Sequence, residues 1–225
     1  MPPLPLPATA VMGLMRGLLA NDLLRYGSAG SGLLLCLFLI AHLAGLVPAL
    51  IAPAFFEAYA SSLHHASWLP LLEIGLVATA ILHITTTISK AIGNRQAGNG
   101  ALLVSRRDQP LAALAARSKV AGGIITLAFL MIHLQQLRWP RPVDGSERAA
   151  LAAVLHNPVN AALYCAAAIT ITLHLLHGNE AAHRNLGWLT PMNSNVIRGG
   201  GRWLAAGLGS GFLLISLALM LAAVP

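Results

Sequence analysis

Five long apolar runs dominate the sequence, and the polar and basic residues gather in the connectors between them. Each run is close to the roughly 20 residues that an α-helix needs to cross a bilayer. The strict apolar–polar alternation of a membrane β-barrel strand is absent from the sequence. The pattern therefore predicts an all-α polytopic membrane protein with five transmembrane helices. Their expected bounds are about 27–50, 68–89, 119–137, 159–177 and 203–224.

The stretch before the first run has a different character. We expect residues 1–26 to form an N-terminal cytoplasmic segment and residues 27–225 to form one membrane domain. Within residues 11–24, apolar side chains such as Val11 and Met15 share one helical face, which predicts a short interfacial helix. Three spaced prolines and the lack of an early basic cluster argue against a secretory signal.

Composition strengthens the membrane interpretation. Of the 225 residues, 56% are hydrophobic and only 9% are charged, whereas soluble domains carry about 25% charged residues. The net charge of +7 comes from basic residues in short connectors, which is typical of membrane topology rather than of a nucleic-acid-binding face. The two cysteines, Cys36 and Cys165, lie inside apolar runs and form no disulfide framework or haem-attachment motif.

The basic residues also predict the orientation. Eleven of the 14 lysines and arginines fall on the side that holds the N-terminus and the even-numbered connectors. The positive-inside rule therefore places the N-terminus in the cytoplasm and the C-terminus outside. We expect the bacterial cytoplasmic membrane, in preference to the mitochondrial inner membrane.

Four histidines are the strongest candidates for chemistry. The first four runs each contain one histidine (His42, His83, His133 and His174), and the fifth contains none. An ionisable residue inside a membrane span is costly and points to function. Each histidine comes about 15 residues after the start of its run, and alternate helices run in opposite directions. Depth therefore pairs His42 with His133 in the outer half and His83 with His174 in the inner half, as bis-histidine ligation of two haems requires.

Small residues near the histidines fit the same hypothesis. Glycine lets a bulky group approach the backbone closely, and a macrocycle needs such room about ten residues from the ligand on the same helix. Gly30, Gly75 and Gly122 occupy such positions. Small residues also pack membrane helices against one another, which explains these glycines equally well.

Other metal and ligand assignments are weaker but stay open. A structural zinc site needs four ligands at one level, and no cysteine joins these histidines. A proton relay is disfavoured because carboxylates are scarce inside the runs. His177 lies one turn after His174 on the same face and is an alternative inner ligand.

At this point the chain resembles a known family, the cytochrome b membrane anchor of succinate dehydrogenase and fumarate reductase, in its five-helix, dihaem class. The resemblance covers nearly the whole chain. It rests on the order of the motifs along the sequence and on which of the alternating outward and inward helices carries each histidine. The motifs are SGLLLCLFLIAHL (31–43), EAYASSLHH (57–65), EIGLVATAILHI (73–84), RSKVAGGIITLAFLMIHL (117–134) and ALYCAAAITITLHLLHG (162–178).

The resemblance implies a dihaem four-helix core with a peripheral fifth helix. His42 and His133 would hold a distal haem b, and His83 and His174 a proximal one, in agreement with the pairing by depth. It also implies a flavoprotein subunit with FAD and an iron–sulfur subunit on the cytoplasmic face, with membrane quinone as substrate. The chain would then serve complex II of the respiratory chain and tricarboxylic acid cycle, in succinate oxidation or fumarate reduction. Higher oligomers of that complex are compatible with this arrangement.

Further residues are candidates for the quinone and for the haem propionates. Quinone chemistry needs a proton donor or acceptor beside an apolar pocket, and Glu57, His64 and Glu73 lie at the expected outer end. Ser31 and Arg117 are candidate propionate contacts at the inner side. Other basic residues there, which ordinary topology explains as well, are Arg25, Lys90 and Lys119.

Two other functions remain alternatives. A nitrate reductase-type anchor is also a five-helix dihaem cytochrome b, but it places two histidine ligands on each of two helices. A haem-free transporter or scaffold would leave the two-level histidine pattern unexplained. Because the chain has no nucleotide-binding glycine motif and no iron–sulfur cysteine spacing, it cannot oxidise succinate alone.

Overall fold

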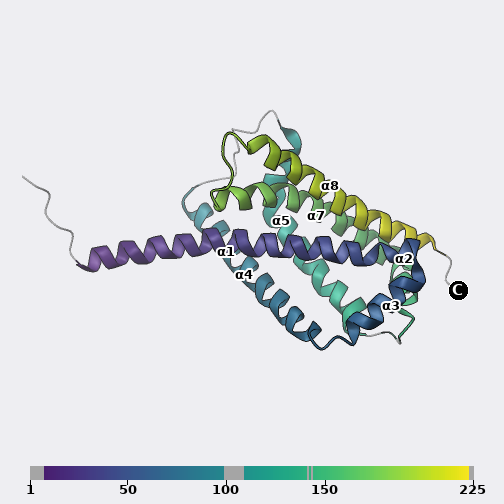
Figure 1. The fold of residues 1–225 in the computed structure, drawn as a ribbon. Coiled ribbons are helices and arrows are strands. Elements are labelled where there is room, and N and C mark those ends of the chain that lie inside the picture. The colour runs from purple at the N-terminus through teal and green to yellow at the C-terminus, as the bar shows by residue number, and fades with distance from the viewer. Residues whose placement is uncertain (1–7, 99–108, 141, 143, 223–225) are drawn as a thin grey trace, which may run out of the picture.

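The computed structural model describes residues 8–98, 109–140, 142 and 144–222, and all the regular structure in these residues is helical (Figure 1). Arg106, Arg107 and Arg141, which contributed to the charge count, lie outside the described residues. The helices in chain order are α1 (Ala8–Leu46), α2 (Pro48–Ile51), α3 (Pro53–His64), α4 (Leu69–Gln96), α5 (Pro110–His133), the π-helix η2 (Leu134–Arg138), α6 (Glu147–His156), α7 (Pro158–Asn185) and α8 (Ser194–Leu221).

Among the described residues, five helices are long and apolar enough to cross a membrane, as the sequence predicts. Each starts before or continues beyond the expected apolar run, because polar and basic residues extend the helix at its ends. The spans are Ala20–Ile51, Leu69–Gln96, Pro110–Arg138, Pro158–Asn185 and Ser194–Leu221.

Local sequence signals explain where several helices begin and end. Proline occupies the first turn of α4, α5 and α7, where its missing N–H costs nothing. The Asn157 side chain caps α7 by accepting hydrogen bonds from the N–H groups of Val159 and Asn160. At the other end of α7, Gly187 takes a positive φ of 75°, which closes the helix as glycine commonly does.

The N-terminal region differs from the expected short, separate helix. Residues 11–24 lie within α1, which runs continuously from Ala8 to Leu46 and extends beyond the other helices (Figure 1). The first membrane helix and the preceding segment are therefore one element in the structure.

Four of the long helices pack as two pairs, and the two pairs contact each other through one helix of each. Helix α4 packs along α1, α5 packs along α7, and α1 also contacts α7. Helix α4 has few backbone contacts with α5 and α7, and only Leu69 and Thr86 of its side chains are buried. The histidine-free α8 packs along α7, where Gly209 lets the Thr172 side chain approach so closely that a Cβ atom would collide with it.

Short helices cover one end of the bundle. Helices α2 and α3 follow α1, and α6 precedes α7, so all three lie at the end that we call the outer end (Figure 1). The opposite end, where α4 and α7 end and α5 and α8 begin, is called the inner end. A buried cluster at the outer end joins α6, α7 and α8 through Leu151, Leu155, Tyr164, Ile215 and Leu219.

Candidate functional site

Four long helices bring their histidines together as two pairs. His42 of α1 and His133 of α5 have ring centroids 6.0 Å apart, with the ring planes at 84°. His83 of α4 and His174 of α7 have ring centroids 6.3 Å apart, with the planes at 76°. The pairing is the one that helix depth predicts, and His174 rather than His177 is the residue opposite His83.

The inner pair is supported by a buried serine of α1. The Ser31 hydroxyl donates to the Gly27 carbonyl oxygen at 2.5 Å, so its lone pairs are free to accept from His83 Nδ1, 3.2 Å away. With the proton on Nδ1, the Nε2 lone pair of His83 remains available for a ligand. Ser31 is thus a partner of the imidazole in this structure, whereas Arg117, the other candidate propionate contact, is exposed on α5.

The outer pair is supported by a chain of hydrogen bonds that the sequence did not reveal. His133 Nδ1 lies 3.2 Å from the Tyr164 hydroxyl, which donates to Gln136 Oε1 at 3.1 Å. Gln136 Nε2 donates to Asn160 Oδ1 at 3.0 Å. Because the tyrosine hydroxyl proton is used on Gln136, the tyrosine oxygen accepts from His133, whose Nε2 lone pair is again left free.

The remaining histidine of each pair, His42 in the outer pair and His174 in the inner pair, has different surroundings. His42 stacks on Phe38 with centroids 5.4 Å apart, and Phe212 of α8 lies 6.0 Å from the same ring. Nδ1 of His174 is buried and has no hydrogen-bond partner. Aromatic rings therefore surround the outer pair. In the inner pair, the Nδ1 atom of His174 makes no hydrogen bond.

The two helix pairs form an internal repeat around the histidines. His83 follows His42, and His174 follows His133, at the same interval of 41 residues. In each of the helix pairs α1–α4 and α5–α7, a glycine ten residues before the histidine of the first helix lies against the histidine ring of the second helix. A Cβ atom on Gly32 would lie 3.1 Å from His83 Cε1, and one on Gly123 would lie 3.7 Å from His174 Cε1.

Gly30, Gly75 and Gly122 were expected to leave room for a haem. The first two have open space beside them, and the third lies at a contact between helices. A Cβ atom on Gly30 or Gly75 would meet nothing within 4 Å, so both positions are open. A Cβ atom on Gly122 would lie 3.7 Å from the Thr170 methyl group, so Gly122 is at a contact between α5 and α7.

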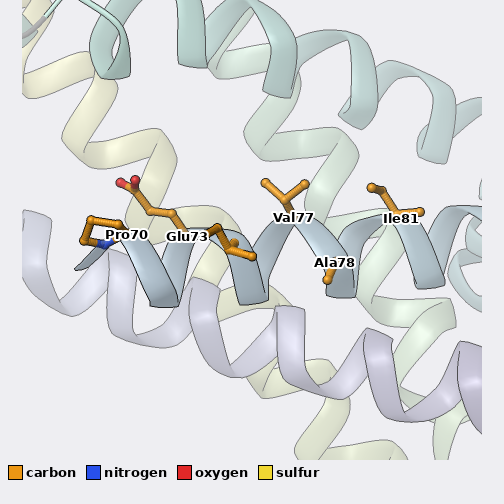
Figure 2. A pocket seen from close by; sticks show the side chains of 6 residues that line it. Pro70, Glu73, Val77, Ala78 and Ile81 are labelled. Atoms are coloured by element: carbon orange, nitrogen blue, oxygen red, sulfur yellow. The ribbon is translucent and has the colours of Figure 1, made fainter. Parts of the chain in front are cut away.

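At the outer end, Glu73 forms a bidentate ion pair with Arg138, the last residue of η2. Arg138 Nε and Nη2 donate to the two carboxylate oxygens at 2.6 and 2.9 Å. Glu73, Val77 and Ile81 project from one side of α4 (Figure 2) and line a mostly apolar, open cavity of about 410 Å³. All the residues that line this open cavity belong to α4, so Glu73 places a carboxylate beside an apolar helix face, a combination of the kind sought for quinone chemistry.

Glu57 and His64 belong to a different cluster at the same end. Glu57 of α3 accepts hydrogen bonds at 3.0 Å from the N–H groups of Glu147 and Arg148, and so caps α6 from another helix. His64 Nδ1 lies 3.6 Å from Glu147 Oε1, and the Glu147 side chain is only 5% exposed. Glu147 is a buried carboxylate that the sequence analysis missed, because nothing in the short α6 sequence marks its burial.

The two carboxyl groups of this cluster have opposite pKa shifts. Burial and the hydrogen bond with Glu147 raise the pKa of Glu57 above its ordinary value of 4.5. Burial alone would raise the pKa of Glu147, but the hydrogen bond with Glu57, backbone N–H groups and His64 together lower it. Of the two carboxyl groups, Glu57 therefore binds a proton more readily than Glu147.

The histidine pairs suit a haem better than a bare metal ion. Among the described residues, no group of three or more histidine, cysteine or acidic side chains converges to hold a metal ion. Two imidazole nitrogens, each about 2 Å from one iron with the ring centre about 1 Å further, place the ring centroids about 6 Å apart. The observed spacings, and the Nε2 lone pairs left free on His83 and His133, fit this geometry.

The fold and the site together define a class, that of all-helical proteins with five potential membrane spans and two histidine pairs formed between four of them. Comparisons with protein-family models, with curated protein sequences and with solved structures gave no match.

Proposed function

We propose that this protein is a dihaem cytochrome b membrane anchor of complex II type, which passes electrons between an iron–sulfur subunit and membrane quinone. The observation that carries the proposal is the pair of histidine spacings, 6.0 Å and 6.3 Å between ring centroids, on four separate helices. A nitrate reductase-type anchor is disfavoured, since it would place two ligands on one helix.

The chain's own contribution would be to hold and orient the four histidines (His42, His83, His133 and His174) toward a bound haem. Haem supplies one-electron transfer when it is bound. Ser31 and Tyr164 accept from Nδ1 of His83 and His133, and so leave the Nε2 lone pairs of these two rings available to a ligand. Gly30 and Gly75 leave open backbone where a large planar group would pass.

The proposed quinone site is the outer-end cavity beside Glu73. Its apolar wall on α4 suits a quinone ring, and the Glu73 carboxylate can exchange a proton with it. The bidentate pair with Arg138 fixes the carboxylate in position. Glu57 and His64 lie in the neighbouring α3–α6 cluster, where proton exchange with the outer aqueous phase is their proposed role.

The partners follow from the same proposal. A flavoprotein subunit with FAD and an iron–sulfur subunit would dock at the inner end, on the cytoplasmic face of the membrane. Succinate oxidation and fumarate reduction use the same arrangement in opposite directions.

Quinol-driven reduction of the purified, haem-loaded chain tests the proposal. We expect a soluble quinol analogue to reduce the haem, and Glu73→Gln to slow this reduction about 100-fold, the lower range for loss of a general acid or base. Asp144→Asn is the matched control, because Asp144 is an exposed carboxylate at the same end. Equal rates in the wild type and Glu73→Gln would remove Glu73 from the site, and no quinol reduction of bound haem would contradict the proposed function.

A further inference from the structure

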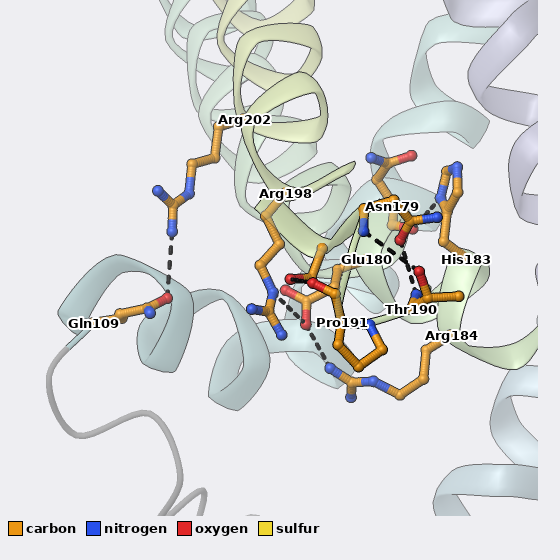
Figure 3. A network of polar contacts seen from close by, with 11 residues as sticks. Gln109, Asn179, Glu180, His183, Arg184, Thr190, Pro191, Arg198 and Arg202 are labelled. Carbon is orange, nitrogen blue, oxygen red and sulfur yellow. Dashed lines mark hydrogen bonds and ion pairs between the residues drawn. The ribbon is translucent and has the colours of Figure 1, made fainter. Parts of the chain in front are cut away.

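A second cavity lies at the inner end, away from the histidine pairs. It has a volume of about 310 Å³ and lies where the start of α5, the last turns of α7 and the first turns of α8 meet. Figure 3 shows the polar side chains around it. Those that matter for its chemistry are Gln109, Asn179, Glu180, Arg198 and Arg202.

The charge around this inner-end cavity is positive. Arg198 and Arg202 are four residues apart on α8 and therefore share a helix face. Glu180, whose side chain is 10% exposed, pairs with Arg184 at 2.5 Å and with Arg198 at 3.4 Å (Figure 3). Two arginines thus pair with one carboxylate. Within the part of the chain that the structure describes, the third arginine, Arg202, makes a 3.3 Å hydrogen bond to the neutral Gln109.

Uncharged donors complete the cavity. Helix α5 begins there with Pro110, and Gln109 makes no side-chain cap, so the N–H groups of Leu111 and Ala112 in the first turn lack intrahelical partners. The Asn179 amide is packed so tightly on Gly201 that a Cβ atom at that position would collide with it. Guanidinium groups, an amide and a helix N-terminus form a set of donors that suits a phosphate group.

The remaining wall of the cavity is apolar. Leu111, Leu176 and Ile197 line it, and Leu111 is 68% exposed. All three helices that form the cavity are long and apolar enough to span a membrane. A basic pocket between the ends of such helices, with apolar surface beside it, matches the two parts of a phospholipid.

We propose that the inner-end cavity binds the phosphodiester group of one anionic phospholipid. Arg198 and Arg202 pair with the phosphate, the first turn of α5 and Asn179 donate to it, and an acyl chain lies along Leu111 and Ile197. This site is independent of the histidine pairs and of the proposed electron transfer.

Native mass spectrometry of the full, delipidated chain in detergent tests the site. The probes are dioleoylphosphatidylglycerol, the zwitterionic dioleoylphosphatidylcholine and inorganic phosphate. We expect one phosphatidylglycerol to bind at least tenfold more tightly than phosphatidylcholine, and Arg198→Gln/Arg202→Gln to abolish that preference. Arg95→Gln, which removes an exposed inner-end charge from α4, is the matched control and is expected to retain the preference.

Arg198 also neutralises the buried Glu180, so its loss lowers the stability of the fold as well. Arg202→Gln alone leaves that pair intact and is expected to weaken phosphatidylglycerol binding several-fold in a folded protein. Equal binding of the two lipids, or an equal loss in Arg95→Gln, would overturn the proposal. Displacement of the lipid by low millimolar inorganic phosphate would assign the cavity to free phosphate and overturn its assignment to a lipid.

Discussion

At the scale of single residues, hydrogen bonds to Nδ1 decide which imidazole nitrogen is free in each histidine pair. Ser31 fulfils this role for His83 and Tyr164 for His133, and each belongs to a different level. Such hydrogen bonds increase the electron donation of a ligating imidazole and thus favour the oxidised metal. The two residues therefore allow each level to be perturbed separately.

We expect Tyr164→Phe to raise the midpoint potential of the haem proposed at the outer histidine pair, the outer haem, by a few tens of millivolts. The potential of the haem proposed at the inner pair, the inner haem, is expected to stay unchanged. A hydrogen bond is worth about 1 kcal/mol, which corresponds to about 40 mV for one electron. Redox titration followed by visible spectroscopy measures both potentials. Ser31→Ala is the matched variant and is expected to shift only the inner haem, so a shift of both haems by either variant would contradict the assignment.

The sequence identifies the four histidines because an imidazole inside an apolar run is conspicuous. Their depth follows from the opposite directions of successive helices. It does not identify Tyr164 or Gln136, since a tyrosine or glutamine near a helix end is ordinary. Their roles depend on the register between α5 and α7 and on the change of pitch in η2, which three-dimensional packing decides. The equal interval of 41 residues from His42 to His83 and from His133 to His174 was present in the sequence and would have revealed the internal repeat.

At the scale of elements, the five apolar helices follow from the hydrophobic pattern, while the short outer-end helices do not. Helices α2, α3 and α6 have 4, 12 and 10 residues, too short for a clear signal of periodicity. Helix α6 has Ser146 at its N-cap position without a side-chain cap, and Glu57 of α3 supplies the missing acceptor from 90 residues away. A cap contributed by a distant segment has no local sequence signal.

This cap predicts an effect on stability. Glu57→Ala leaves the first N–H groups of α6 without their acceptor and is expected to reduce the free energy of unfolding by about 1–2 kcal/mol. Thermal unfolding of the detergent-solubilised protein measures the change. Glu57→Gln retains one acceptor and is expected to lose less, so equal losses in the two variants would show that capping is not the cause.

The paired carboxyl groups predict a pH dependence. The lowered pKa of Glu147 means that its contribution to stability is present above pH 4.5 and is lost as the pH falls through its folded-state value. The raised pKa of Glu57 has the opposite sign, and its contribution is lost as the pH rises from 4.5 through its folded-state value.

The stability that comes from this pair therefore has its maximum around pH 4.5. Unfolding temperatures measured across this range are expected to decline on both sides of the maximum. In Glu57→Gln, which mimics the protonated acid, the decline on the alkaline side is expected to disappear. Its persistence in that variant, with Asp144→Asn as the control, would assign it to other groups.

At the scale of the whole molecule, the helix pairs α1–α4 and α5–α7 pack against each other through α1 and α7, and α8 packs along α7. Helix α4 packs along α1 and contributes its histidine opposite α7 while making few backbone contacts with α5 and α7. The fold class and the five potential spans were predictable from apolar length alone. The loose placement of α4 and the inner-end cavity were not, because both depend on how the helix pairs are spaced.

The central claim is that each histidine pair holds one haem, and haem quantification with a reduced-minus-oxidised visible spectrum of the purified chain tests it most directly. We predict two low-spin b-type haems per chain. His42→Ala or His133→Ala should remove one, and His83→Ala or His174→Ala the other, whereas His177→Ala should retain both. A colourless wild-type protein, purified from haem-sufficient cells and unable to take up added haem, would contradict the account and leave a haem-free membrane scaffold or transporter.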